Sequence, residues 1–288
     1  MKTITLKPES KNFTPDVVAA IEQLREGGTL LFEKGEYHFF EQGCFIGTFA
    51  PSNNETGIKN VVFPLLGVSN ITVDGGGSTF VFHENSSPFI IRNSKNVTVK
   101  NAVLTTHFTP YALMKITDKN DSSFTARFDN TKIPCDAVGG NLIFKAETGD
   151  ISTLNGKLSM HATNRMLIRY LFAGDCKASR LGLAAPYVDC SVERNGNDFV
   201  FRYSDDEKAA KCEYDVGETV SINLEERRAR DVFFLEKAEN TKISNITILR
   251  GGGMGIMAQL CHDIEIEKLI VLKKKSMICS MSFLIPTS

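Results

Sequence analysis

Two carboxylates, Glu265 and Glu267, stand two positions apart in a stretch that is predicted to form a strand. Side chains at alternate positions of a strand point to the same face, so one acid could donate a proton while the other accepts one. A solvated outer face is the alternative interpretation, and we favour it. Asp74 precedes three glycines and is interpreted as a turn former, because aspartate bonds to nearby backbone amides. The other candidate acids are Glu225, Glu226, Asp231 and Asp263.

Arg228 and Gln259 are the candidate ligand-binding residues. Arg228 belongs to the charged run Arg227, Arg228, Arg230 and Asp231, in which a guanidinium could hold hydroxyl groups or orient a carboxylate. A salt-bridge cluster between domains is the plainer interpretation of that run. The amide of Gln259 suits hydroxyl recognition because it both donates and accepts hydrogen bonds. A buried amide ladder between strands is its structural alternative.

The sequence indicates neither a metal ion nor a cofactor. The run Gly251-Gly252-Gly253 lacks the Lys-Ser/Thr pair of a phosphate-binding loop. The seven cysteines include no C-x-x-C pair, so we expect reduced thiols. Four histidines show no mutual spacing that is typical of metal ligands: His38, His83, His107 and His161.

A short repeat defines the elements that must position these residues. Residues 96–104 follow the pattern Asn-h-x-h-x-x-h-x-h, where h is apolar. Residues 240–248 and 263–271 follow it too, with Thr241 at one apolar position and Asp263 in place of the opening asparagine. Residues 70–75 match its first half. Each copy predicts two short strands joined by a bend, for which asparagine is suited because it tolerates a left-handed backbone. The spacing of the starts, from 70 to 96 and from 240 to 263, is typical of a parallel β-helix, in which inward residues such as Val97 and Ile243 stack in ladders.

Two further elements are predicted around this repeat. Thr14 is the expected N-cap, and Pro15 the first-turn residue, of an amphipathic helix that would cover the open end of the β-helix core. Between Asn96 and Asn240, alternating apolar residues and polar turns predict an inserted antiparallel β-barrel or sandwich. The expected division is 1–107 for the cap and first coils, 108–230 for the inserted domain, 231–272 for further coils and 273–288 for a non-matching tail.

Charge and hydropathy exclude several classes of partner. The chain has 33 Lys and Arg against 34 Asp and Glu, which gives a net charge of −1. A nucleic acid or an anionic membrane would call for a basic surplus, so neither is expected as a partner. No stretch approaches the ~18 apolar residues of a membrane span. The N-terminus shows no signal-peptide run, so we expect a cytoplasmic location.

Several runs of residues carry a resemblance to known families. The predicted helix, the stretch 28–39 and the run 70–78 resemble right-handed β-helices of the pectin-lyase type. The run 252–259, which follows Phe233-Phe234-Leu235, together with the inserted domain, resembles glycoside hydrolase family 110 over about residues 14–272. The resemblance implies an all-β, right-handed parallel β-helix that hydrolyses terminal α-1,3-linked galactose with inversion. The implied partner is a galactose-containing glycan.

The C-terminal tail departs from this family. Residues 273–288 contain no asparagine bend, no glycine and no acid. The resemblance implies catalytic carboxylates on later coils, so we expect a truncated chain whose catalytic residues lie beyond Ser288. An exposed last coil would offer unpaired strand edges and favour self-association. A non-catalytic carbohydrate-binding β-helix module and a polysaccharide lyase or polygalacturonase are the alternatives, and the latter would need clustered carboxylates that the sequence does not show.

Overall fold

The computed structural model describes residues 2–52, 56–107, 111–128, 135–146, 149–152, 157–158, 160–162, 188–203, 215–223, 230–251, 253–271 and 281–284. This part of the chain is built mainly of strands and contains one helix, which confirms the all-β prediction. The chain divides into two units, which are treated separately below. Unit 1 comprises Met1–His107 and Arg227–Ser288, and unit 2 comprises Phe108–Glu226. Among the described residues, no helix has the length and apolar character needed to cross a membrane.

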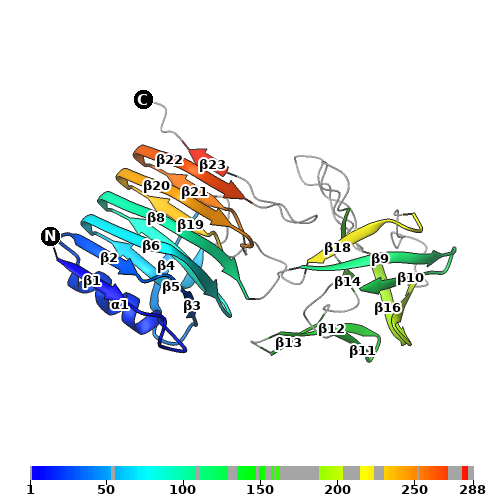
Figure 1. Ribbon diagram of the computed structural model, residues 1–288. Helices are drawn as coiled ribbons and strands as arrows, with labels where there is room; N and C mark the ends of the chain where they lie inside the picture. The colour runs from blue at the N-terminus through cyan, green and yellow to red at the C-terminus, as the bar shows by residue number, and fades with distance from the viewer. Residues whose placement is uncertain are drawn as a thin grey trace. The chain divides into compact units, whose positions relative to one another are not determined.

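Unit 1 contains two sheets made mainly of parallel strands (Figure 1). The first sheet has the order β1-β2-β6-β8-β20-β22, and β3 pairs with the second half of β6. Its strands are β1 (Thr3–Leu6), β2 (Gly28–Phe32), β3 (Glu36–Phe39), β6 (Ser69–Phe82), β8 (Lys95–Thr106), β20 (Glu239–Ile248) and β22 (His262–Val271). The second sheet has the order β23-β21-β19-β7-β5-β4, in which only β4 is antiparallel to its neighbour. Its strands are β4 (Phe45–Phe49), β5 (Gly57–Leu66), β7 (Ser86–Arg92), β19 (Phe233–Glu236), β21 (Ile256–Gln259) and β23 (Met281–Leu284).

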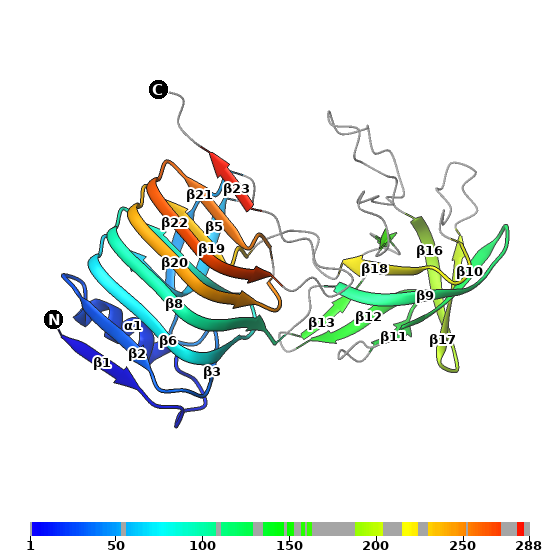
Figure 2. The same cartoon turned by 45° about the horizontal axis from the view of Figure 1, so that its top comes forward.

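From β5 onward, the chain of unit 1 alternates between the two sheets (Figure 2). Each of these strands therefore pairs with the strand that follows it along the chain in the same sheet. In the first sheet, Val73, Val99, Ile243 and Ile266 are aligned across four neighbouring strands. The hydrophobic core lies between the sheets, since the buried residues of the first sheet share one cluster with Phe89 and other residues of the second.

The bends of the first sheet are made by residues in the left-handed backbone region. Asn70, Asn96, Asn240 and Asp263, which open the copies of the sequence pattern, have φ of 55°, 55°, 47° and 54°. Asparagine and aspartate tolerate this region better than most residues. The Nδ2 of Asn96 donates to Oδ1 of Asn70, and Nδ2 of Asn240 donates to Oδ1 of Asn96, each over 2.7 Å. The bends are therefore joined by a ladder of side-chain amides.

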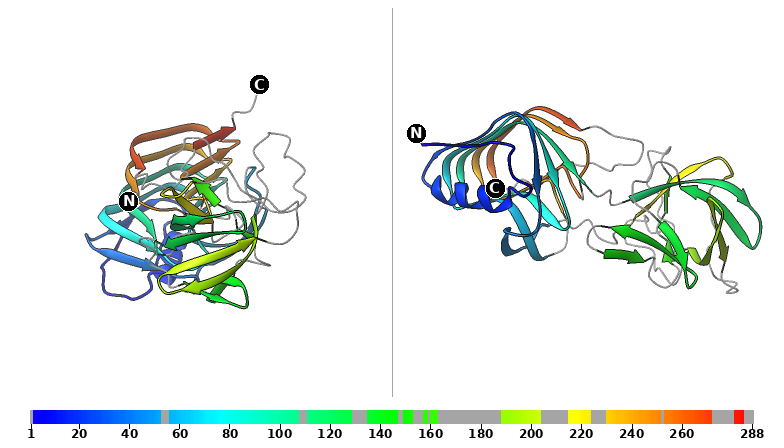
Figure 3. Two further views of the ribbon diagram at one scale, coloured as in Figure 1. Left: turned by 90° about the vertical axis from the view of Figure 1, so that its right-hand side faces the viewer. Right: turned by 60° about the horizontal axis from the view of Figure 1, so that its bottom comes forward.

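The helix α1 (Thr14–Gln23) lies at the N-terminal end of unit 1 (Figure 3). Its residues Val17 and Ile21 are buried and belong to the core between the sheets, so one face of the helix packs against that core. The prediction that Thr14 is the N-cap is wrong. Phe13 precedes the helix without a side-chain cap, and the Thr14 hydroxyl donates to the carbonyl oxygen of Phe40 over 2.8 Å. The Oδ1 of Asn12 accepts the hydrogen bond from the backbone N–H of Thr14 instead, at 3.0 Å.

Unit 2 consists of antiparallel strands. One sheet has the order β14-β16-β17-β10-β9-β18-β15 and a smaller one has the order β11-β12-β13. The stacked rings of Phe124 and Phe201, with centroids 4.5 Å apart, lie in its buried interior. The strands are β9 (Tyr111–Lys119), β10 (Ser123–Phe128), β11 (Cys135–Val138), β12 (Asn141–Ala146), β13 (Gly149–Ser152), β14 (Lys157–Leu158), β15 (Met160–Ala162), β16 (Val188–Asn195), β17 (Asp198–Tyr203) and β18 (Thr219–Asn223).

Candidate functional site

The second sheet of unit 1 carries a row of polar residues at the ends of three neighbouring strands. Arg92, Glu236 and Gln259 are the last residues of β7, β19 and β21, and the pairing register aligns all three. Alternate residues of a strand face opposite sides. Phe233 and Leu235 point into the core, so Glu236 points to the opposite face of the sheet. We call Arg92, Glu236 and Gln259 the polar row.

An apolar row runs beside the polar row on the same outer face. Ile90, Phe234 and Met257 each stand two positions before a member of the polar row, and all three are buried. They pack with Phe49 of β4 and with Met254 in a small cluster of their own. These three positions of the outer face are therefore shielded from solvent, and the polar row lies beside them.

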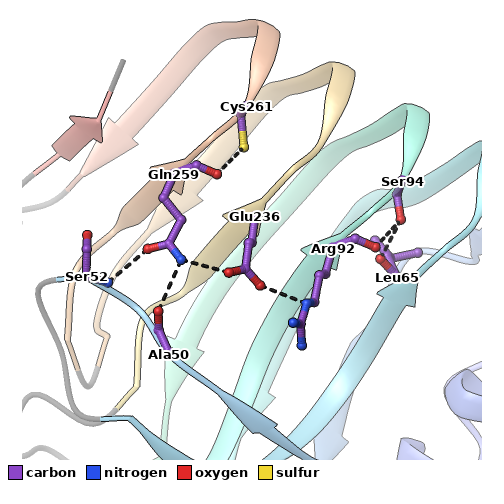
Figure 4. A network of polar contacts seen from close by, with 8 residues as sticks. All are labelled: Ala50, Ser52, Leu65, Arg92, Ser94, Glu236, Gln259 and Cys261. Atoms are coloured by element: carbon purple, nitrogen blue, oxygen red, sulfur yellow. Dashed lines mark hydrogen bonds and ion pairs between the residues drawn. The ribbon is translucent and has the colours of Figure 1, made fainter. Parts of the chain in front are cut away.

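The side chains of the polar row bind one another in sequence (Figure 4). Arg92 Nε lies 2.7 Å from Glu236 Oε2, and Gln259 Nε2 donates to Glu236 Oε1 over 3.0 Å. The Glu236 side chain is 12% exposed, whereas that of Arg92 is 39% exposed. The Arg92 guanidinium also lies over the ring of Phe49, 5.7 Å from its centroid. A carboxylate that is largely removed from water needs such partners, because an unpaired buried charge is costly.

Gln259 is buried and connects the row to residues 50–52. Its Oε1 accepts from the backbone N–H of Ser52 over 2.9 Å, and its Nε2 donates to the carbonyl oxygen of Ala50 over 3.1 Å. With the bond to Glu236, these contacts use both N–H donors and one lone pair of the amide. Gln259 thus fixes a backbone segment across the sheet, and its predicted contact with a ligand stays a prediction.

The charged run at the C-terminal boundary of unit 2 is described in part. Arg228, with Arg227, Glu225 and Glu226, lies outside the described residues. Arg230 and Asp231 are both buried, and both bind the backbone of unit 1. Arg230 Nη1 donates to the carbonyl oxygen of Glu84, and Asp231 Oδ1 accepts from the backbone N–H of Met254 over 3.0 Å. The two residues therefore hold the chain where it enters β19.

The paired acids Glu265 and Glu267 lie on the outer face of the first sheet. Their carboxylates flank Lys242 Nζ at 3.0 and 2.9 Å, and their side chains are 55% and 50% exposed. Hydrogen bonding to Lys242, and then to Glu265, lowers the pKa of Glu267. Both acids are thus partners of a lysine, and the prediction that they lie on a solvated face is confirmed.

Asp74 bonds to a nearby backbone amide, as predicted, but it lies inside β6, where the register against β8 shifts between Asp74 and Ser78, and not in a turn between strands. Its Oδ1 accepts from the backbone N–H of Gly76 over 3.0 Å and from Asn101 Nδ2 over 2.9 Å. Its Oδ2 lies 3.2 Å from Lys100 Nζ. Burial acts to raise the pKa of Asp74, but these partners outweigh burial and leave the pKa below its usual value. A carboxylate held ionised in this way is unsuited to proton donation near neutral pH.

Three histidines that showed no relation in the sequence lie together in unit 1. His38 Nδ1 is 2.8 Å from His83 Nε2, and the rings of His83 and His107 are stacked with centroids 4.6 Å apart. The available signal was the spacing between His83 and His107, which is close to the period of the strand pattern. Among the described residues, no group of His, Cys, Asp and Glu side chains has the arrangement of a metal site.

Comparison with known proteins identifies relatives over most of the chain. No model of a known protein family matches it. The sequence is 26% identical over 250 residues to alpha-1,3-galactosidase A of Shewanella woodyi, covering 86% of this chain and 39% of that protein. It is 24% identical over 280 residues to an alpha-1,3-galactosidase B of Phocaeicola vulgatus, covering 94% of this chain and 43% of that protein. An alpha-1,3-galactosidase B of Akkermansia muciniphila is 29% identical over 141 residues, covering 48% of this chain and 18% of that protein.

These relatives are longer than the chain. It spans about two fifths of the length of the first two relatives. Over most of its own length, the chain is therefore similar to proteins named alpha-1,3-galactosidase.

Proposed function

We propose that this chain is part of a glycoside hydrolase of family 110 that acts on terminal α-1,3-linked galactose of glycans. The single observation that carries the proposal is its similarity to proteins named alpha-1,3-galactosidase, which extends over 86% and 94% of the chain in two relatives. Such hydrolysis with inversion uses two carboxyl groups about 6.5–9.5 Å apart, with room for a water molecule between one of them and the sugar. No catalytic carboxylate is assigned among the described residues.

The scaffold in this proposal is a right-handed parallel β-helix of the pectin-lyase type, with a β domain inserted at residues 108–230. The alternation of successive strands between two sheets supports it. So does the register, which aligns Ile71 with Val97 and Thr241 with Ile264, in each case at equivalent positions of successive copies of the sequence pattern. A coil that adds one strand to each sheet gives such a register.

The polar row is the proposed support of the sugar-binding surface. Gln259 already bonds to Glu236 and to residues 50 and 52, so we assign it the positioning of that backbone segment. Arg228 remains a proposed sugar contact. A fixed backbone segment presents N–H and C=O groups in constant geometry, which is what recognition of sugar hydroxyls requires.

A non-catalytic glycan-binding module is the second candidate. It is favoured by the contacts of four candidate acids in the described part of the chain, all of which already have partners within the protein. Glu265 and Glu267 bind Lys242, whereas Asp74 and Asp231 bind backbone amides. A polysaccharide lyase or polygalacturonase is a third possibility, which the clustered carboxylates of a calcium site would favour.

Incubation of the full chain with an α-1,3-linked galactosyl disaccharide tests the proposal. The α-1,4-linked isomer is the matched control, and ¹H NMR reports both galactose release and the anomer formed first. Release of β-galactose from the α-1,3 isomer alone supports the hydrolase. Because the proposal makes this chain part of a longer hydrolase, the same assay is run on a version extended by the next in-frame coils. Selective binding without release by both versions supports the glycan-binding module. Neither release nor binding by either version, or equal action on both isomers, overturns the proposal.

We also propose that copies of the chain associate through β22. This strand is the last of its sheet in the part of the chain that the structure describes. Its ladder residues Ile264 and Ile266 are only partly buried, and Ile270 is 53% exposed. A strand edge with exposed apolar residues is a template for pairing with another chain.

A further inference from the structure

Three rings are stacked at the ends of β3, β6 and β8. Phe40, His83 and His107 directly follow these strands, which pair side by side. The ring centroids of Phe40 and His83 are 4.0 Å apart and those of His83 and His107 are 4.6 Å apart, with 18° between the planes in both pairs. His83 is buried between its neighbours, while His107 is exposed.

A chain of hydrogen bonds enters this stack from the side. His38 Nδ1 lies 2.8 Å from His83 Nε2, and His38 Nε2 lies 3.1 Å from Glu36 Oε1. An ionised carboxylate only accepts, so Nε2 of His38 is the donor in the bond to Glu36. Two imidazole nitrogens form a hydrogen bond only when one carries a proton and the other does not. The bond between the two histidines therefore fixes how many protons the pair can hold.

The pair can keep its hydrogen bond with one added proton but not with two. With both rings neutral, His83 Nε2 donates to His38 Nδ1. After one proton is added, His38 carries a hydrogen on each ring nitrogen and the hydrogen of His83 is on Nδ1, so His38 Nδ1 donates to His83 Nε2 and the bond is kept with its direction reversed. After a second proton is added, two N–H donors face each other across 2.8 Å, and the buried ring of His83 carries a charge. The second proton is incompatible with the bond.

We propose that Glu36, His38 and His83 form an acid-sensitive latch, which holds the end of β3 against the end of β6 and opens when the pair binds a second proton. Histidine is the side chain whose charge changes between pH 5 and 8 in ordinary surroundings. Opening of the latch separates the turn after β3 from the ring stack. His107, the last ring of that stack, is also the last residue of unit 1 before the chain passes into unit 2.

The charged groups around the latch do not change the number of protons that the two histidines can carry while their hydrogen bond is kept. Among the described residues they include Glu36 on β3, Glu41 after β3, Glu84 after His83, Arg230 before β19 and, when protonated, His107 after β8. The carboxylates of Glu41 and Glu84 accept backbone N–H groups of Asn85 and Glu41, each over 2.9 Å. Arg230 donates to the carbonyl oxygen of Glu84. None of these groups lies between the two facing nitrogens, so the two donors still conflict after the second proton.

Urea unfolding of the full chain between pH 7.5 and 4.5 tests the latch. The variant His38→Gln can turn its amide oxygen toward a protonated His83, so it removes the conflict between donors. Below about pH 6, we expect the unfolding equilibrium constant of the wild type to rise as the pH falls. For each pH unit this rise should be about tenfold larger than that of the variant, which corresponds to the uptake of one more proton on unfolding. The exposed His262, on β22, is the control position, and His262→Gln should keep the wild-type slope.

Two further measurements keep the test decisive. Imidazole NMR signals should show His38 and His83 titrating in two separate steps, the second accompanied by loss of the wild-type signals at the end of β3. If His38→Gln does not fold, His83→Phe keeps a ring in the stack and should show the same reduced slope. Equal slopes in the wild type and the folded variant, or a single titration step without structural change, would overturn the proposal.

Discussion

Gln259 Nε2 and Glu236 Oε1 meet at 3.0 Å from equivalent positions on neighbouring strands. The contact links the ion pair of Arg92 and Glu236 to the backbone of residues 50–52. The side chains involved come from β7, β19 and β21, and unit 2 separates the first of these strands from the other two in the sequence. The polar row therefore joins the chain before unit 2 to the chain after it.

Replacement of Glu236 should destabilise unit 1. Glu236→Ala leaves Arg92 without its ion-pair partner and removes a hydrogen-bond acceptor of Gln259, and we expect the free energy of unfolding to fall by about 1–3 kcal/mol. The partial exposure of Arg92 keeps the loss below that of a fully buried pair. Urea unfolding measures the change, and Glu265→Ala, at an exposed site, is the control with an effect of at most about 0.5 kcal/mol. Equal losses in both variants would show that the polar row is not structural.

The sequence pattern was sufficient to predict the first sheet but not the polar row. Asparagine or aspartate at each bend and apolar residues at alternate positions define strands such as β8 and β20 wherever they occur, so their alignment could be inferred from spacing. The polar row has a different residue type on each strand, and β7 and β19 are separated by unit 2. Contacts between unlike residues at such a separation leave no periodic signal. The sequence therefore indicates Gln259 as a candidate residue but gives no signal for its partners Glu236 and Arg92.

The hydroxyl of Thr241 provides a test of the ladder in the core. Thr241 occupies a buried ladder position aligned with Val97 and Ile264, and its Oγ1 has no hydrogen-bond partner within the described structure. Burying an unpaired hydroxyl costs roughly 1–3 kcal/mol. Thr241→Val keeps the shape and removes that cost, so we expect stability to rise by about 1 kcal/mol in urea unfolding. Thr247→Val, at a partly exposed position of the same strand, should change it by less than about 0.5 kcal/mol.

The amide ladder at the bends predicts that alanine and glycine at position 96 destabilise the protein to different extents. Asn96 has φ of 55° and bonds to Asn70 on one side and Asn240 on the other. Asn96→Ala loses both bonds and adds backbone strain, so we expect a loss of about 2–3 kcal/mol. Asn96→Gly loses the same bonds without strain and should lose about 1 kcal/mol less than the alanine variant. Thermal unfolding separates the two variants, and an alanine variant as stable as the glycine variant would contradict the role given to the left-handed bend.

The edge of β22 predicts the association state of the chain. Because Ile270 is 53% exposed on the last described strand of its sheet, we expect oligomers in size-exclusion chromatography with multi-angle light scattering. A lysine on an exposed strand edge opposes pairing, since its charge would be brought against another chain. Ile270→Lys should therefore shift the distribution toward monomer. Ile58→Lys, at a residue that is 74% exposed on β5, is the matched control and should leave the distribution unchanged. A sharp monomer peak for the wild type, or an equal shift in both variants, would show that β22 is not the contact.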